Sequence, residues 1–365
     1  MPSSIPQDIW IHYEGEKYKT NDFIFHFQQN KNEHIQAIIE FIENWNSNSD
    51  YIIQKTSGST GKPKKIKIQK NQIKASALAT LKTLNIEKGD HALLSINPVF
   101  IGGKMMIARA ILGGLDLHIA PIIANPIKYF KTETAIDFFS FVPYQMEKII
   151  DESPEKINFL EQSKVIILGG APVSEVLAQK IKSHFNQTKV YSTYGMTETV
   201  SHVALKLINS KKKEYFNALS GVSFSVDKRN CLSINAPKIS GQTSLITNDV
   251  VELISSTQFN WLGRYDFVIN SGGIKIHPEI IEKEISTLFA EFNIKNRFFV
   301  FGLPHEKFGE SLNLMLEGEG DIKKIKELLK LNLKAFYVPK KIFLNQQFIE
   351  TENGKINRVK TIESI

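Results

Sequence analysis

Short apolar runs alternate with longer stretches of helical period from residue 51 to about residue 199, and this alternation constrains the fold most. Residues 90–96 and 164–168 have the length and composition of buried strands. Residues 70–85, 103–112 and 174–185 instead carry apolar residues at helical spacing. Strands alternating with helices are typical of an α/β fold, which we predict for this part of the chain.

The pattern changes after Ser201. Short alternating runs with turn residues predict a β-rich part over about residues 202–262. The last hundred residues mix helical and strand patterns again. These changes of pattern divide the chain into an α/β part, a β-rich part and a last α+β part.

Composition excludes several classes of protein. The chain has 365 residues, of which 42% are hydrophobic, so it can bury a core large enough for two or three domains. One cysteine, Cys231, excludes an internal disulfide. The first residues lack the basic and apolar regions of a secretory signal, and no apolar run is long enough to cross a membrane. We expect a cytoplasmic protein that does not insert into a membrane.

The formal charge of +7 is spread along the chain. Nucleic-acid binding would require basic residues interleaved with aromatic residues on one face, and the sequence has no such module. We therefore expect no nucleic acid as partner. A positive net charge instead favours the binding of polyanionic small molecules.

Residues 56–64 form a loop of glycines, hydroxyl residues and lysines between two short apolar runs. Small residues let backbone N–H groups approach an anion closely. The common nucleoside-triphosphate loop has four residues between its glycines, whereas Gly58 and Gly61 are separated by two. We predict a different phosphate-binding loop, with a flexible hairpin as the alternative.

Four further motifs follow in order: Gly169-Gly170-Ala171-Pro172, Tyr194-Gly195-Met196-Thr197-Glu198, Gly263-Arg264-Tyr265-Asp266 running into Ser271-Gly272-Gly273, and Asn353-Gly354-Lys355-Ile356-Asn357-Arg358. With the loop, they resemble the adenylate-forming enzymes: acyl- and aryl-CoA synthetases, luciferases and the adenylation domains of peptide synthetases. The resemblance covers residue 51 to the C-terminus. It implies the fold of that family, with a large N-terminal domain of residues 1–265, which includes the β-rich part, and a small mobile α+β domain of residues 266–365.

The resemblance implies ATP, Mg²⁺ and coenzyme A as ligands and a carboxylic acid as substrate. The residues that match the family's ATP phosphate site are Thr56, Ser57, Gly58, Ser59, Thr60, Gly61 and Lys64. Those that match its adenine and ribose site are Gly170, Ala171, Pro172, Ser192, Thr193, Tyr194, Gly195, Asp249 and Arg264. Tyr194 would offer its ring to the base. For Asp249 a turn residue is the alternative interpretation.

Catalytic roles carry over in the same way. Glu198 matches the acid that recruits Mg²⁺, a cation that prefers a few carboxylates and phosphate oxygens, and Thr197 matches a donor to the α-phosphate. Lys355 matches the catalytic lysine of adenylation. Asp266 occupies the family's hinge position, and Ser271, Gly272 and Gly273 match the loop that contacts coenzyme A.

The acid is inferred from residues 100–109 and 196–202, which look most like the o-succinylbenzoate–CoA ligases of menaquinone synthesis. That acid keeps a second carboxylate after activation, so its pocket needs a cation or several donors. The candidates are Lys104, Arg109, Ser201 and His202. Each has a structural alternative; Arg109 could extend from its helix to solvent. The histidine that often follows Pro98 in that family is absent.

Members of the family usually carry a far longer region before the phosphate loop. We expect that a wall of the pocket comes from elsewhere, for example from a second copy of the chain in a homo-oligomer. The alternatives to o-succinylbenzoate are another aryl or acyl acid, or transfer of the acyl group to a carrier protein. A nucleotide-binding regulatory protein is a further alternative, which Glu198 and Lys355 disfavour.

Overall fold

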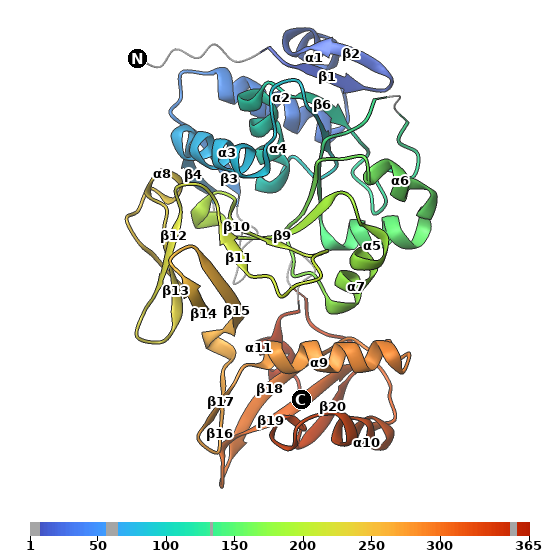
Figure 1. Cartoon of the computed structure of the whole chain (residues 1–365), viewed down its shortest axis with the longest axis vertical. Coiled ribbons are helices and arrows are strands. Elements are labelled where there is room, and N and C mark those ends of the chain that lie inside the picture. The colour runs from blue at the N-terminus through green and yellow to red at the C-terminus, as the bar shows by residue number, and fades with distance from the viewer. Residues whose placement is uncertain (1–7, 56–64, 132–133, 351–355) are drawn as a thin grey trace.

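The structure is a computed structural model that describes residues 8–55, 65–131, 134–350 and 356–365. One large sheet with its helices fills the upper part of the molecule, and a small sheet with three helices lies below it (Figure 1). A separate two-stranded ribbon, β3 (Tyr51–Lys55) and β4 (Lys65–Gln69), lies beside the large sheet.

The described residues of the large sheet form thirteen strands. Their spatial order is β12 (Ser223–Val226), β13 (Cys231–Asn235), β14 (Leu245–Ser255), β15 (Gln258–Arg264), β11 (Phe216–Ala218), β10 (His202–Leu207), β9 (Lys189–Gly195), β8 (Val165–Leu168), β7 (Phe138–Phe141), β5 (His91–Leu94), β6 (Asp116–Ile119), β1 (Trp10–Tyr13) and β2 (Glu16–Lys19). The β-rich part is therefore continuous with the α/β part, and it does not form a sheet of its own.

Strands β9, β8, β7, β5, β6 and β1 run parallel to one another, whereas the strands from β10 to β12 pair antiparallel. Strand β10 also pairs antiparallel with β9, and β2 pairs antiparallel with β1. A parallel sheet is stable when helices cover both faces. The helices around the large sheet are α1 (Thr20–Phe27), α2 (Glu33–Asn46), α3 (Lys70–Leu84), α4 (Ile101–Gly113), α5 (Pro143–Glu152), α6 (Ile157–Leu160), α7 (Glu175–His184) and α8 (Pro237–Ser240). Helices α2 to α4 pack on one face, and α5 to α7 pack on the other.

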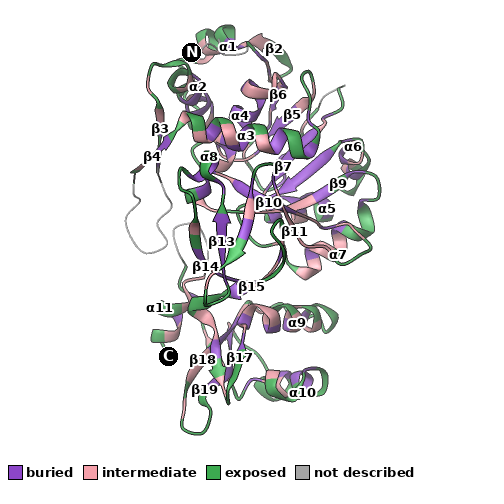
Figure 2. Ribbon diagram, turned by 60° about the vertical axis from the view of Figure 1, so that its left-hand side comes forward, coloured by how far each residue is buried: buried purple, intermediate pink, exposed green. Residues whose placement is uncertain are grey.

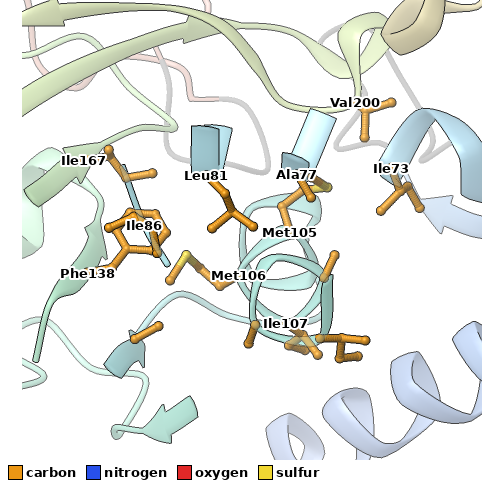
Figure 3. Close-up of a cluster of buried hydrophobic side chains, with 14 of the residues drawn as sticks. Ile73, Ala77, Leu81, Ile86, Met105, Met106, Ile107, Phe138, Ile167 and Val200 are labelled. Atoms are coloured by element: carbon orange, nitrogen blue, oxygen red, sulfur yellow. The ribbon is translucent and has the colours of Figure 1, made fainter. Parts of the chain in front are cut away.

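The core on the first face centres on α4. Figure 3 shows Met105 and Met106 of α4 beside Ala77 and Leu81 of α3, in one cluster with Phe138 of β7. Full burial of a large apolar side chain stabilises a fold by about 1.5–3 kcal/mol. Figure 2 shows the buried strands at the centre and the exposed outer sides of the helices. Helix α4 is therefore held firmly, which matters because it carries two candidate site residues.

The small sheet begins at β16 (Ile269–Ser271), after the 3₁₀ turn η3 (Tyr265–Phe267). Its other strands are β17 (Ile274–Ile276), β18 (Phe298–His305), β19 (Gly309–Glu317) and β20 (Lys341–Asn345), and its helices are α9 (Pro278–Glu291), α10 (Ile322–Asn332) and α11 (Arg358–Glu363). It buries its own apolar cluster, with Ile281 of α9 and Leu314 of β19 at the centre. The predicted domain boundary at residue 266 stays a prediction.

The predicted helices and strands of residues 70–199 are confirmed as α3, β5, α4, β8 and α7, and the Ser174 side chain caps α7 by accepting from Leu177 N (3.1 Å). The mixed α/β fold is confirmed as well. In the parts of the chain that the structure describes, no helix is both long and apolar enough to cross a membrane.

Candidate active site

The candidate site lies at the carboxyl ends of β8 and β9, where ligands bind in open α/β sheets. Leu168 at the end of β8 pairs with Ser192 of β9, so the loop of residues 169–172 lies next to the last residues of β9. Thr193 Oγ1 donates to the Leu168 carbonyl (3.0 Å) and joins the two strand ends. The structure thus brings together Gly170, Ala171, Pro172, Ser192 and Thr193, as the resemblance implied.

A tight turn follows β9 and presents Thr197 and Glu198. Gly195 pairs with His202 of β10, and a Cβ atom at Gly195 would collide with the backbone of Ser201 and His202. The 3₁₀ turn η2 (Thr197–Thr199) closes the reversal, and Val200 takes a positive φ of 63°, which is rare for a β-branched residue. Such strain persists only where the surroundings enforce it, often at functional sites.

Glu198 on this turn is exposed, whereas Thr199 is buried and accepts from Met196 N (3.0 Å). An exposed carboxylate beside a threonine hydroxyl fits Mg²⁺, which binds few protein oxygens and takes the rest from water and phosphate. The geometry of the turn is therefore compatible with the predicted metal role of Glu198.

Tyr194 and Asp249 form a partly buried hydrogen bond that connects β9 with β14. The Tyr194 hydroxyl donates to Asp249 Oδ2 (2.6 Å), and burial followed by the Asp249 charge raises the pKa of Tyr194. The Tyr194 ring contacts the ring of Phe259 edge-on at 5.1 Å. Asp249 is therefore a strand residue with a partner; the alternative of a turn residue is wrong.

Arg264 completes this group. It pairs with Asp249 in the β14–β15 register, and its Nη1 lies 3.8 Å from Asp249 Oδ1. Its Nη2 also donates to Asp266 Oδ2 (3.1 Å), which in turn accepts from Asn248. The predicted ribose residues thus adjoin the predicted hinge residue.

Arg109 of α4 is fully buried and belongs to a polar cluster on the face of the large sheet that α2 to α4 cover. Its Nη2 donates to Ser201 Oγ (2.9 Å), and Ser201 Oγ lies 3.4 Å from His202 Nδ1. His202 Nε2 in turn lies 3.1 Å from Thr80 Oγ1. The alternative that Arg109 extends to solvent is wrong, because only 2% of the residue is exposed.

The charge of Arg109 has no carboxylate partner within 4.0 Å among the described residues, and its Nε is buried without a hydrogen bond. Burial lowers the pKa of Arg109 to about 9. Burial, and then the Arg109 charge, lowers the pKa of His202 well below its ordinary value, so this ring is neutral. A buried cation of this kind is costly unless an anion pairs with it.

Lys104 lies earlier in α4, and its Nζ donates to Gln54 Oε1 (2.9 Å) at the end of β3. The structure therefore associates Lys104 with the strand that leads into the predicted phosphate loop. Of the four candidates for the acid, Arg109, Ser201 and His202 lie together in one cluster.

The predicted phosphate loop, from Thr56 to Lys64, lies outside the described residues. Its flanks are described: Lys55 pairs with Lys65 at the end of the β3–β4 ribbon, so the loop joins two paired strands. Lys355 also lies outside the described residues. Helix α11, which begins three residues later, lies with α9 on the side of the small sheet that faces the large one (Figure 1).

Ser271, Gly272 and Gly273 lie at the tight turn between β16 and β17. Gly272 and Gly273 have φ of 59° and 81°, so both central residues of this two-residue turn need the left-handed region that glycine tolerates. Both glycines are exposed, which leaves room for a ligand to approach the backbone.

Sequence reasoning missed Thr80 and the pairing of Tyr194 with Asp249. The signal for Thr80 was weak: it is a polar residue, like Ser76, on the mostly apolar buried face of α3. The pairing of Tyr194 with Asp249 joins residues 55 positions apart, and no local pattern indicates it.

Comparison with solved structures identifies the fold. The o-succinylbenzoate CoA synthetase of Bacillus subtilis, in complex with its acyl-adenylate intermediate, is 19% identical and has a TM-score of 0.69 over 84% of this chain and 68% of its own. An acyl-CoA synthetase (AMP-forming)/AMP-acid ligase II-like protein of Dyadobacter fermentans is 34% identical, with a TM-score of 0.61 over 92% of this chain and 95% of its own. The fold is thus that of the adenylate-forming CoA ligases.

The AMP-binding enzyme family matches residues 11–224, which is more than half of the chain, so this protein belongs to that family of AMP-forming acyl-CoA ligases. The match begins forty residues before the segment that the motifs had identified. Among curated relatives, a 2-succinylbenzoate–CoA ligase of Listeria monocytogenes is 25% identical over 89% of this chain and 72% of its own length.

Proposed function

We propose that this enzyme activates o-succinylbenzoate, or an aryl acid that likewise carries a second carboxylate, and transfers it to coenzyme A. The reaction would form an acyl-adenylate and pyrophosphate from the acid and ATP. The thiol of coenzyme A would then attack the acyl carbon, and AMP would leave. The product would serve menaquinone synthesis.

The buried guanidinium of Arg109 carries this proposal. A cation that is removed from water and has no described carboxylate partner is expensive to maintain. A carboxylate on the substrate would pair with it in a charge-assisted hydrogen bond. Ser201 already accepts from Arg109 Nη2 and is only partly buried, so its hydroxyl would contact the same carboxylate.

The rest of the reaction needs groups that gather around the α-phosphorus. The loop from Thr56 to Lys64 would bind the outer phosphates, and Glu198 would bind Mg²⁺, which neutralises phosphate charge. Asp249 would accept from ribose hydroxyls beside Arg264. Lys355 would donate to the oxygens that gain charge during adenylation, and Gly272 and Gly273 would later adjoin coenzyme A.

Several curated relatives support the choice of acid, because 2-succinylbenzoate–CoA ligases of Listeria monocytogenes and Lactococcus lactis match most of the chain. They are only 25% and 24% identical, so the cluster around Arg109 is the stronger argument.

The test measures pyrophosphate release and thioester formation with o-succinylbenzoate, benzoate and a medium-chain fatty acid. We expect kcat/KM for o-succinylbenzoate to exceed that for benzoate by about 10- to 100-fold, the value of one charge-assisted contact. Higher kcat/KM with benzoate or the fatty acid would refute the assignment. Acyl transfer to a carrier protein but not to coenzyme A would refute the proposed transfer to coenzyme A and leave the proposed adenylation standing.

A further inference from the structure

Three histidines meet on one face of the large sheet, near the edge that β1 and β2 form. His12 of β1 pairs directly with His118 of β6, and the two strands run parallel. Strand β5 pairs with β6 so that Leu93 lies opposite His118, and His91 lies two residues earlier on the same face of β5. The register alone therefore brings three imidazoles from three neighbouring strands together.

The side chains make close contacts. His91 Nδ1 lies 2.9 Å from His118 Nε2, and the rings of His12 and His118 stack with centroids 4.0 Å apart. One nitrogen from each of the three rings lies within 4.8 Å of the other two. In a tetrahedral zinc site the nitrogens are about 3.3 Å apart, given a metal–nitrogen distance near 2.0–2.1 Å. The rings of His12 and His118 are stacked at an interplanar angle of 7°, so binding one ion would require at least one of them to rotate until its nitrogen faces the other two.

The surroundings also suit a metal. His12 Nε2 donates to Asp116 Oδ2 (3.4 Å), and a carboxylate in this role orients imidazoles that ligate metals. Lys17 also pairs with Asp116, at 3.5 Å.

We propose that His12, His91 and His118 bind one divalent transition-metal ion of the Zn²⁺ class. Imidazole ligands suit Zn²⁺, Co²⁺ and Ni²⁺, whereas Mg²⁺ and Ca²⁺ prefer oxygen ligands. His12 and His118 also line a groove of about 960 Å³, through which the ion and a water ligand would enter. Its three ligands include none of the residues that we assign to ATP, Mg²⁺ or the acid.

The ion would connect the β1–β2 pair at the edge of the large sheet to strands β6 and β5. Strand β1 joins β6 through two register pairs, Ile11 with Leu117 and His12 with His118. Ligands from β1, β5 and β6 on one ion would cross-link three strands whose sequence positions span more than one hundred residues. The role we assign is therefore structural.

The test uses the full chain, without an affinity tag and after treatment with a chelator. Equilibrium dialysis against Zn²⁺ in excess Mg²⁺, with elemental analysis, should find one Zn²⁺ per chain, and Co²⁺ should give the visible bands of tetrahedral nitrogen coordination. His12→Asn, His91→Asn and His118→Asn should each weaken binding by at least about tenfold. His184→Asn, at an exposed histidine of α7, is the matched control and should bind as the original chain does.

Hydrogen exchange gives a second readout. Zn²⁺ should slow exchange of the amides of β1 in the original chain but not in His12→Asn. The proposal is overturned if the original chain binds no stoichiometric Zn²⁺ or Co²⁺, or if His12→Asn binds as tightly as His184→Asn. The direct measurement on the original chain decides even if His118→Asn fails to fold.

Discussion

Arg109 Nη2 donates to Ser201 Oγ at 2.9 Å and thereby joins the buried side of α4 to the strained turn between β9 and β10. The same turn carries Thr197 and Glu198. Ser201 follows Thr197 and Glu198 closely in sequence, so a ligand that contacts Arg109 and Ser201 would lie next to the turn that carries the residues we assign to the phosphate chemistry. In the proposed function, this contact would link recognition of the acid with its activation.

We predict opposite effects of Arg109→Met on stability and on acid binding. The variant should increase the free energy of unfolding by about 1–4 kcal/mol, because it replaces a desolvated charge by an apolar side chain. It should raise the KM for the diacid by about 10- to 100-fold and leave the KM for ATP unchanged. Chemical denaturation and steady-state kinetics check this, with Lys82→Met on the exposed side of α3 as control. Lower stability with normal acid kinetics would make Arg109 a structural residue.

Tyr194→Phe tests the bond that orients Asp249. Loss of a buried hydrogen bond to a carboxylate should cost about 1.5–3 kcal/mol of stability. We expect the KM for ATP to rise, with little change for the acid, because Asp249 would no longer be fixed beside Arg264. Tyr191→Phe, on the same strand, is the control. If the two variants show equal ATP kinetics, the bond has no role in nucleotide binding.

Glu279 should make stability depend on pH. It lies on α9, its Oε1 accepts from Arg264 N (3.3 Å), and its Oε2 is buried without a partner in the described structure. Burial raises its pKa above the ordinary value of 4.5. Between the pKa of the unfolded chain, 4.5, and the higher pKa of the folded chain, the folded chain holds more protons than the unfolded chain. This residue therefore lowers the free energy of unfolding as the pH rises from 4.5 through the folded-state pKa.

Glu279→Gln should therefore stabilise the protein more at pH 7 than at pH 4.5. Urea denaturation at both pH values checks this, and Glu291→Gln, at the exposed end of the same helix, is the control. An equal effect of Glu279→Gln at both pH values would contradict the burial of a charged carboxylate at this position.

Lys355→Ala should separate the two half-reactions. We expect adenylate formation to fall by about 10²-fold or more, the usual loss when a donor to a developing charge is removed. Thioester formation from prepared acyl-adenylate should remain, because that step releases no pyrophosphate. Comparable losses in both assays would exclude the assigned role.

Asp266→Pro should instead impair thioester formation and spare adenylate formation. Asp266 lies on η3, between the end of the large sheet and the start of the small sheet, and accepts from Asn248 and Arg264. Proline restricts φ of its own residue and the conformation of the preceding Tyr265. We expect near-normal adenylation and a large loss of thioester formation, measured in separate half-reaction assays. Normal transfer to coenzyme A would exclude rotation about this residue.

The sequence by itself determined the class of the enzyme and helices and strands such as α3, β5, α4, β8 and α7. Motifs such as Tyr194 to Glu198 are contiguous, and the periods of α3, α4 and α7 depend on residues a few positions apart. Local spacing determines these features, so a single chain reveals them.

The tertiary structure alone decided which side chains meet. Arg109 and Ser201 are 92 residues apart, Tyr194 and Asp249 are 55 apart, and His12, His91 and His118 come from three strands. These contacts depend on strand register and on the rotation of α4 against the sheet. A shift of one residue in register would turn His118 to the opposite face, and no local pattern in the sequence records that choice.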